Sequence, residues 1–399
     1  MQRWLLRCGL AAAVLTGLPA HSQSLKDALE GAWNRQPAAR ASGAREDELA
    51  ARRDAAIALF PEPPSVRLGY RTDQPNQNAG VRELEGVLSL PMWTPAARGA
   101  AQALAEAEFE QFGSGLRSQR WRLAGEVRET YWQARLAASE MEVAQRKVDE
   151  AVVLAADVER RLKAGELART DHNQARSAEQ LARAALADTR GRTYRAAQAF
   201  FVLTGLKSLP AVAETVAAAS RDLDRHPQLD ANDRAAATAR AKLGQAATAT
   251  RDPPEIEVGM RRERPVFGEP YANSVIVGIK VPFSTDSRNQ PRIAAASTEL
   301  MEAQVTSTLE RQKLATDIVA AESELDQARE IEQLAAERFR LAMDTQALFA
   351  KAFALGELDL PARLRAENDR FDAELALTRA RIEMGRAISR LNQALGVFP

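Results

Sequence analysis

The stretch Arg161-Leu162-Lys163-Ala164-Gly165-Glu166-Leu167 decides how the rest of this sequence is interpreted. It separates two long Ala-rich helical runs, and an echo of it, Phe353-Ala354-Leu355-Gly356-Glu357-Leu358-Asp359, separates two more Ala-rich runs. Glycine readily adopts the positive φ that ends a helix and turns the chain. The sequence therefore predicts two helical hairpins, with tips at residues 161–168 and 353–360.

The echo belongs to an internal duplication of the whole chain. Gly356 follows Gly165 by 191 residues, and Pro282 follows Pro91 by the same offset. Such a period far exceeds the 20 to 50 residues of solenoid repeats, so it indicates one doubling of a large unit rather than a repeat array or chance matches in an Ala/Arg-rich chain. The predicted repeats are residues 21–210 and 211–399.

Residues 1–20 are typical of a secretory signal peptide. Arg3 and Arg7 precede an apolar run from residue 9 to residue 18, and Pro19-Ala20 precedes polar sequence. Cys8, the only cysteine, lies in this leader in a poor context for lipidation, so the mature chain has no disulfide or thiol chemistry. Removal of the leader leaves 52 basic against 54 acidic residues, a net charge of −2 that argues against a nucleic-acid partner.

Two segments change from helical periodicity to alternation with a period of two. They predict strands at about residues 64–72 and 81–91, and again at about 255–262 and 272–283. In the first strand Val66, Leu68 and Tyr70 share one face, whereas Arg67 and Arg71 share the other. Each strand is therefore expected to have one apolar and one polar face.

Two explanations fit these strands. They could form an ordinary sheet on a soluble core, or a barrel wall with its apolar face toward lipid and its polar face toward water. Aromatic residues near the strand ends (Tyr70, Trp93, Tyr271 and Phe283) and the signal peptide favour the second. Four strands cannot close a barrel, since the smallest have about eight, so the second explanation demands oligomerisation.

Helices are predicted over residues 24–60, 95–163, 168–204, 221–250, 291–355 and 359–395. In each repeat the two shorter helices together have about the length of the long one, at roughly 1.5 Å per residue. We hypothesise that they stack end to end alongside it. Narrow apolar stripes flanked by small residues predict coiled-coil contacts between these helices, which a soluble coiled-coil scaffold would also show.

The ordered and duplicated set of strands and tips resembles the TolC-like outer membrane efflux proteins over the whole mature chain, and among them the shorter members that serve heavy-metal efflux systems. The resemblance is carried by the units that end in Ser89-Leu90-Pro91 and Lys280-Val281-Pro282, by the two tips, and by the segment Asp171-His172-Asn173-Gln174-Ala175-Arg176.

This resemblance implies a mainly α-helical homotrimer. Its α-helical barrel would cross the periplasm and continue into a 12-stranded β-barrel in the lipid of the outer membrane, with four strands from each protomer. Such proteins are passive ducts that dock by their hairpin tips onto a periplasmic adaptor (membrane fusion protein) serving an inner-membrane RND-type pump. The adaptor contacts implied here are Lys163, Gly165, Glu166, Leu167, Gly356, Glu357, Leu358 and Asp359.

Some members of this family have an acidic ring at the periplasmic entrance, six and nine residues past the second tip glycine. Here those positions hold Ala362 and Arg365, so that ring is absent as such, whereas Asp171 matches the equivalent position of the first hairpin. Arg365, with Arg363 and Glu367, either lines an entrance or pairs on a solvated helix face; the sequence leaves both open.

The sequence contains none of the common motifs that indicate an enzyme. It has no Gly-rich phosphate loop, no HExxH and no CxxC, and His21, His172 and His226 are scattered. We therefore expect no catalytic site, no bound metal and no cofactor. Within the duct interpretation, multidrug efflux and type I secretion compete with metal efflux; a periplasmic coiled-coil scaffold or adaptor is the alternative of another class.

Overall fold

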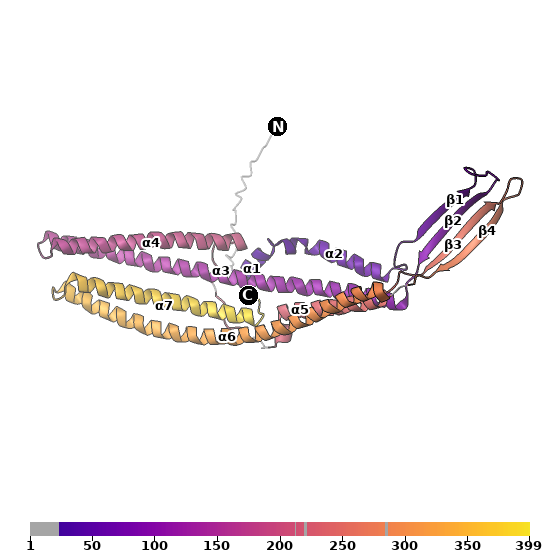
Figure 1. Ribbon diagram of the computed structural model, residues 1–399. Coiled ribbons are helices and arrows are strands. Elements are labelled where there is room, and N and C mark those ends of the chain that lie inside the picture. Colours follow the sequence, from indigo (N-terminus) through magenta and orange to yellow (C-terminus); the bar gives the residue numbers. More distant parts are fainter. Residues whose placement is uncertain (1–23, 212, 219–221, 284–285) are drawn as a thin grey trace, which may run out of the picture.

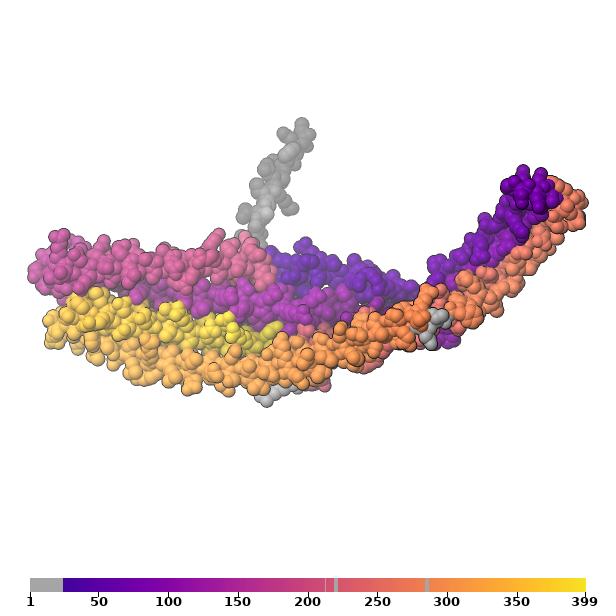
Figure 2. Space-filling view, viewed as in Figure 1, coloured from indigo at the N-terminus to yellow at the C-terminus, as the bar shows by residue number. Residues whose placement is uncertain are grey.

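The computed structural model describes residues 24–211, 213–218, 222–283 and 286–399, so the predicted signal peptide lies outside the described residues. The chain forms a long helical body from which one small sheet projects at an angle (Figure 1). Both hairpin tips lie at the end of the body opposite the sheet (Figure 2).

Each of the two repeats is built along one long helix, and the two long helices have equal length. Helix α3 (Pro95–Lys163) and helix α6 (Asp286–Ala354) each have 69 residues. Helix α3 begins where the sequence predicts, because the Thr94 side chain accepts a hydrogen bond from the backbone N–H of Ala97 and proline occupies the first helical position. The return helices are α4 (Arg169–Thr204) and α7 (Leu360–Ala394).

The prediction of one helix over residues 24–60 is wrong. The segment forms α1 (Leu25–Trp33) and α2 (Pro37–Ile57), separated by a tight turn in which the Gln36 amide donates to the Trp33 carbonyl at 2.9 Å. Pro37 has no amide to continue the hydrogen-bond ladder and disfavours a helical conformation at Gln36, so the chain starts a second helix there.

The corresponding helix of the second repeat also begins later than predicted. Helix α5 spans Pro227–Thr248 and follows the short 3-10 helix η1 (Leu223–Arg225), whereas residue 221 lies outside the described residues. Pro227 occupies the first helical position and His226 is the N-cap, since its Nδ1 accepts from the Gln228 amide at 3.2 Å. Proline thus fixes the start of the helix as it does in α2.

The end-to-end stacking of short helices is confirmed in both repeats. Along α3 lie α4 on one side of the middle and α1 with α2 on the other (Figure 1). Along α6 lie α7 and α5 in the same arrangement, and α3 also contacts α5 and α7. The two repeats therefore pack along their whole length.

The four strands form a single antiparallel sheet in the order β1-β2-β3-β4. They span Ser65–Thr72, Arg82–Pro91, Glu255–Arg264 and Ala272–Lys280. The fourth strand ends three residues earlier than predicted and the third extends two residues further. Pairing of β2 with β3, from Arg82 opposite Arg264 to Pro91 opposite Glu255, joins the two repeats.

The two faces of this sheet differ in chemistry, as the alternation predicts. One face carries aliphatic and aromatic side chains in register across all four strands; for example, Val66, Leu88, Val258 and Val277 form one row. Most of these side chains are exposed, Val277 to 73% and Leu68 to 78%. No helix covers either face of the sheet (Figure 1).

The opposite face is lined by ion pairs. Arg261 pairs with Glu83 at 2.9 Å and with Glu85 at 2.8 Å, and Lys280 pairs with Glu255 at 2.8 Å. Cross-strand pairs of opposite charge stabilise a sheet modestly. This face is therefore adapted to water and the first face to an apolar environment.

A buried polar cluster holds the repeats together near the middle of the body. The Arg128 side chain of α3 is 3% exposed and donates to Glu214 of the linker at 2.8 Å and to the Val397 carbonyl at 2.9 Å. Ser389 of α7 donates to Glu214 at 2.7 Å and accepts from the Trp132 indole at 2.9 Å. The cluster satisfies a buried charge through residues that are distant in sequence.

Candidate functional site

Both hairpin tips end their first helix in the same hydrogen-bonded turn. After α3 the Gly165 amide donates to the Leu162 carbonyl and the Glu166 amide donates to the Arg161 carbonyl, both at 2.9 Å. After α6 the Gly356 and Glu357 amides repeat this pattern at 3.1 and 2.9 Å. This is a Schellman motif, which requires a left-handed residue at the position of the glycine.

The two tip glycines are required by backbone conformation and not by crowding. Gly165 has φ +81° and Gly356 has φ +77°, and a Cβ atom at either position would meet nothing within 4 Å. Both turns are therefore open to solvent, as a protein-binding surface needs.

The predicted contact residues divide into two groups. Lys163, Gly165, Glu166, Gly356, Glu357 and Asp359 are exposed, whereas Leu167 and Leu358 are half-buried. Leu167 and Leu358 pack on an apolar cluster between the hairpins, composed of Leu154, Ala155, Val158, Ala175, Phe353 and Leu360. The two leucines thus anchor the turns, and the exposed group is available to a partner.

Two of the exposed charges already have local roles. The Lys163 ammonium pairs with Glu159 one turn earlier at 2.8 Å, and this hydrogen bond holds the pKa of the Glu159 carboxyl below its usual range. The Asp359 side chain accepts from the Ala362 amide at 2.9 Å and so caps α7. The unpaired amides at the start of α7 make this carboxylate favourable there.

Phe353 joins the two tips, a role that the sequence analysis did not assign. Its side chain is 2% exposed, and the guanidinium groups of Arg161 and Arg363 lie 5.1 and 4.9 Å from its ring centroid. Arg161 also donates to the Phe353 carbonyl at 3.4 Å. An aromatic residue at the end of an Ala-rich helix, beside the tip glycine, is the signal in the sequence that points to this position.

Within one protomer the predicted entrance residues have separate local partners. The Asp171 side chain accepts from the Ala168 amide at 3.1 Å and so stabilises the start of α4. Arg363 pairs with Glu367 at 3.1 Å, with both side chains largely buried between the hairpins. Burial raises the pKa of Glu367, and the neighbouring Arg363 opposes this effect.

Arg365 points away from that pair. It is exposed, and no ion pair to it occurs in the described part of the chain. Arg363 and Glu367 thus pair with each other on one helix face, which is one of the two arrangements that the sequence left open. This face packs against Phe353 and is not solvated. The entrance role of Asp171, Arg363, Arg365 and Glu367 stays a prediction.

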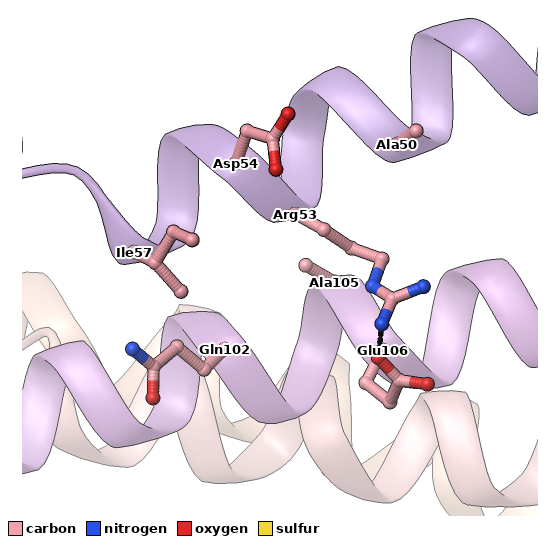
Figure 3. A pocket seen from close by; sticks show the side chains of 7 residues that line it. All are labelled: Ala50, Arg53, Asp54, Ile57, Gln102, Ala105 and Glu106. Carbon is pink, nitrogen blue, oxygen red and sulfur yellow. Dashed lines mark ion pairs between the residues drawn. The ribbon is translucent and has the colours of Figure 1, made fainter.

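The body also has open grooves between helices. One groove of about 410 Å³ lies between α2 and α3, where Arg53 reaches across to Glu106 at 2.8 Å above the small side chains of Ala50 and Ala105 (Figure 3). Its walls place no converging set of reactive groups around a substrate. No group of three or more potential metal ligands occurs among the described residues.

None of the described helices has the length and apolarity that crossing a membrane requires.

Comparisons with known proteins agree with this architecture. Residues 29–206 match the family model described as outer membrane efflux protein. No curated protein sequence matches the chain.

Solved structures of similar fold cover nearly the whole chain. The structure of CusC, described in terms of folding and transmembrane channel formation, has a TM-score of 0.75 at 18% identity and covers 94% of this chain and 92% of that one. The outer membrane protein VceC from Vibrio cholerae has a TM-score of 0.73 at 15% identity, covering 94% and 97%. The CmeC outer membrane channel from Campylobacter jejuni has a TM-score of 0.74 at 13% identity, covering 93% and 85%.

Proposed function

We propose that this chain, whose residues 29–206 match the family model of outer membrane efflux proteins, belongs to that family and is the outer membrane duct of a tripartite efflux system. In this role it carries no chemistry of its own, in keeping with a family of channels rather than enzymes. It conducts substrate passively from an inner-membrane RND-type pump and a periplasmic adaptor to the cell exterior.

The two-faced sheet is the observation that carries this proposal. A contiguous exposed apolar face is costly in water and marks a surface that contacts protein or lipid. The opposite face is polar and rich in ion pairs, as the wall of a water-filled lumen is. Since no helix covers the apolar face, lipid is the environment that suits it.

Closure of the sheet requires further copies of the chain. Strands β1 and β4 are the two edges, and each has one unpaired row of backbone groups that lipid cannot satisfy. Three copies pairing edge to edge give a closed barrel of 12 strands, which removes every edge. The helical bodies of the same trimer then form a periplasmic tube beneath it.

The hairpin tips are the proposed docking site for the adaptor. They lie at the end of the body farthest from the sheet (Figure 2), and their exposed backbone and charges are presented on rigid Schellman turns. Rigid presentation lowers the entropic cost of binding. The exposed contacts are Lys163, Gly165, Glu166, Gly356, Glu357 and Asp359.

The proposed substrate is a heavy-metal cation, and this finer assignment rests on resemblance in length and tip sequence. The absence of a metal-ligand cluster in the described residues is compatible with passage without binding, in which case selectivity lies with the pump. Deletion of the gene should then raise sensitivity to metal cations and leave sensitivity to organic drugs unchanged. Drug sensitivity alone, or loss of a secreted protein, would favour multidrug efflux or type I secretion.

A matched pair of substitutions on β4 tests the membrane assignment. Val277 lies on the apolar face, whereas Ile276 beside it lies opposite Gly259 on the other face. An arginine on the lipid face costs about 2–4 kcal/mol near the bilayer midplane, and lumen positions tolerate charge. Val277→Arg should therefore deplete the protein from the outer membrane fraction, and Ile276→Arg should not.

The competing class, a soluble periplasmic coiled-coil scaffold, predicts a different outcome. A scaffold would be recovered from the periplasm as a soluble species, and Val277→Arg would improve its solubility. Native mass spectrometry of the detergent-extracted wild type adds an independent measurement, since the duct requires a trimer.

A further inference from the structure

The apolar face of the sheet ends in a group of arginines at its tip, away from the helices. Arg82 of β2 pairs in register with Arg264 of β3, and Arg262 lies one row below, opposite Leu84. These three are the only charged residues of the four strands on this face, because every acidic residue of the strands has the opposite orientation. The face is thus apolar along its length and cationic at one end.

Aromatic rings hold the arginines in place. The Arg262 and Arg264 guanidinium carbons lie 4.6 and 5.0 Å from the Tyr271 ring centroid, and Arg264 lies 5.3 Å from that of Phe267. The Phe267 amide donates to the Ala79 carbonyl at 3.0 Å, which ties the two loops of the tip together. Stacking orients a guanidinium and leaves its in-plane N–H groups able to donate. The Arg264 Nε–H already donates to the Gly80 carbonyl at 3.3 Å, so the site would use the terminal nitrogens of Arg264.

The positive charge of this group is only partly neutralised. Arg82 pairs with Asp73 at 3.0 Å, whereas Arg262 and Arg264 have no carboxylate partner in the described residues. Like charges directly opposite each other on neighbouring strands destabilise a sheet. Three arginines against one aspartate leave two positive charges, so an anionic partner would stabilise this end of the sheet.

The position along the strands indicates which anion. From the row of Leu90 and Ile256 to the row of Arg82 and Arg264 the strand advances eight residues, about 27 Å at roughly 3.4 Å per residue. At the strand tilt of about 35–45° in such barrels, this length corresponds to about 19–22 Å of height. The apolar band of an outer membrane barrel is about 25 Å tall. The arginine row therefore lies about 3–6 Å inside the outer edge of the band, a distance that an arginine side chain spans to reach the headgroups.

We propose that Arg262 and Arg264, supported by Arg82, bind the phosphomonoester headgroups of anionic lipid in the outer leaflet. The inference rests on the proposed function, since it requires the apolar face to contact lipid. Phosphate oxygens match the planar fork of a guanidinium and accept two parallel hydrogen bonds from it. The site would fix the depth of the sheet in the membrane.

The test uses the full-length protein extracted in mild detergent and measures retained lipid by native mass spectrometry. Diphosphoryl lipid A is the probe, and its dephosphorylated form and inorganic phosphate are the comparison ligands. The variant is Arg262→Gln/Arg264→Gln. Its matched control is Arg71→Gln, because Arg71 lies at the same end of the sheet on the opposite face, paired with Glu83 at 3.7 Å.

The double variant should bind diphosphoryl lipid A roughly 25-fold more weakly, since each arginine near an anionic surface contributes about fivefold. The control should bind as the wild type does, and the dephosphorylated lipid should bind all three equally weakly. The inference would be overturned if the double variant bound the lipid as the wild type does, or if the control lost binding equally. Competition by inorganic phosphate at matching concentration would also overturn it. A wild type that never enters membranes would instead overturn the proposed function.

Discussion

Replacing Phe353 by alanine should separate the two hairpin tips without unfolding the rest of the chain. The ring is 2% exposed, and the cluster around it is the only described apolar cluster that includes residues from both tips. Truncation of a buried phenylalanine costs about 3–5 kcal/mol, including the cavity that it leaves. The stacking of Arg161 and Arg363 on the ring is lost as well, at about 0.5–1 kcal/mol for each partly exposed pair.

The expected loss is local because the tip cluster is separate from the other cores. The largest cluster lies around Tyr131 and Phe200, near the middle of the body, and does not include tip residues. Native-state hydrogen exchange of the backbone amides should therefore accelerate by at least about 100-fold at both tips, since about 1.4 kcal/mol corresponds to a factor of ten. Amides near Tyr131 should exchange as in the wild type.

Leu355→Ala supplies the matched control. Leu355 lies two residues from Phe353 but is 66% exposed, so its truncation should change the free energy of local opening by less than about 0.5 kcal/mol. Binding to the adaptor should weaken for Phe353→Ala and stay unchanged for Leu355→Ala if the rigid tips are the docking site. Unchanged exchange at the α3–α4 tip in Phe353→Ala would refute the conclusion that Phe353 clamps the two hairpins.

Three further predictions follow from the backbone and from buried polar groups. Gly165→Ala should lower stability by about 1 kcal/mol, because φ is +81° there, whereas Gly43→Ala in the interior of α2 should raise it; thermal melting compares the two. Burial lowers the pKa of His226 to about 4 from its usual 6.5, so the neutral form is favoured in the folded state. The free energy of unfolding should therefore keep its full value above pH 6.5 and fall by about 3 kcal/mol as the pH drops to 4. His226→Asn, which can still cap α5, should show no such loss when urea titrations at the two pH values are compared. Arg128→Ala should lower the free energy of unfolding by about 3–5 kcal/mol in denaturant titrations, because it leaves Glu214 buried without its cationic partner. Adding Glu214→Gln should recover part of this loss. A smaller loss in the single variant than in the double variant would contradict the role assigned to the pair.

The positions of the two tips and most helix boundaries were predicted correctly because their causes are local. Thr94 with Pro95 starts α3, and Gly165 ends its last turn. Proline without an amide and glycine with a positive φ act within one turn of the chain, so neither depends on distant residues. The turn at Gln36 was missed although Pro37 causes it, because the surrounding helical pattern continues on both sides.

The docking site stays a prediction, and the structure gives the positions of its residues. The exposed tip residues follow from the position of the turns, but the role of Leu167 could not be read from the sequence, and the capping role of Asp171 was missed although its cause is local. Leu167 is held by a cluster whose members come from both hairpins. Asp171, expected at an entrance, caps its own helix, since any carboxylate three residues into a helix can reach back to the free amide.

The sequence by itself determined the elements of this protein: two helical hairpins, four two-faced strands and a duplicated order of both. Hydrophobic period, proline and glycine are sufficient for this because they act over a few residues. Only the tertiary structure decided which elements meet. The pairing of β2 with β3 joins residues about 170 positions apart, and the contacts of Arg128 with Val397 and of Arg161 with Phe353 span 269 and 192 positions. Such contacts depend on the packing of both repeats at once, and no local pattern in either segment encodes its distant partner.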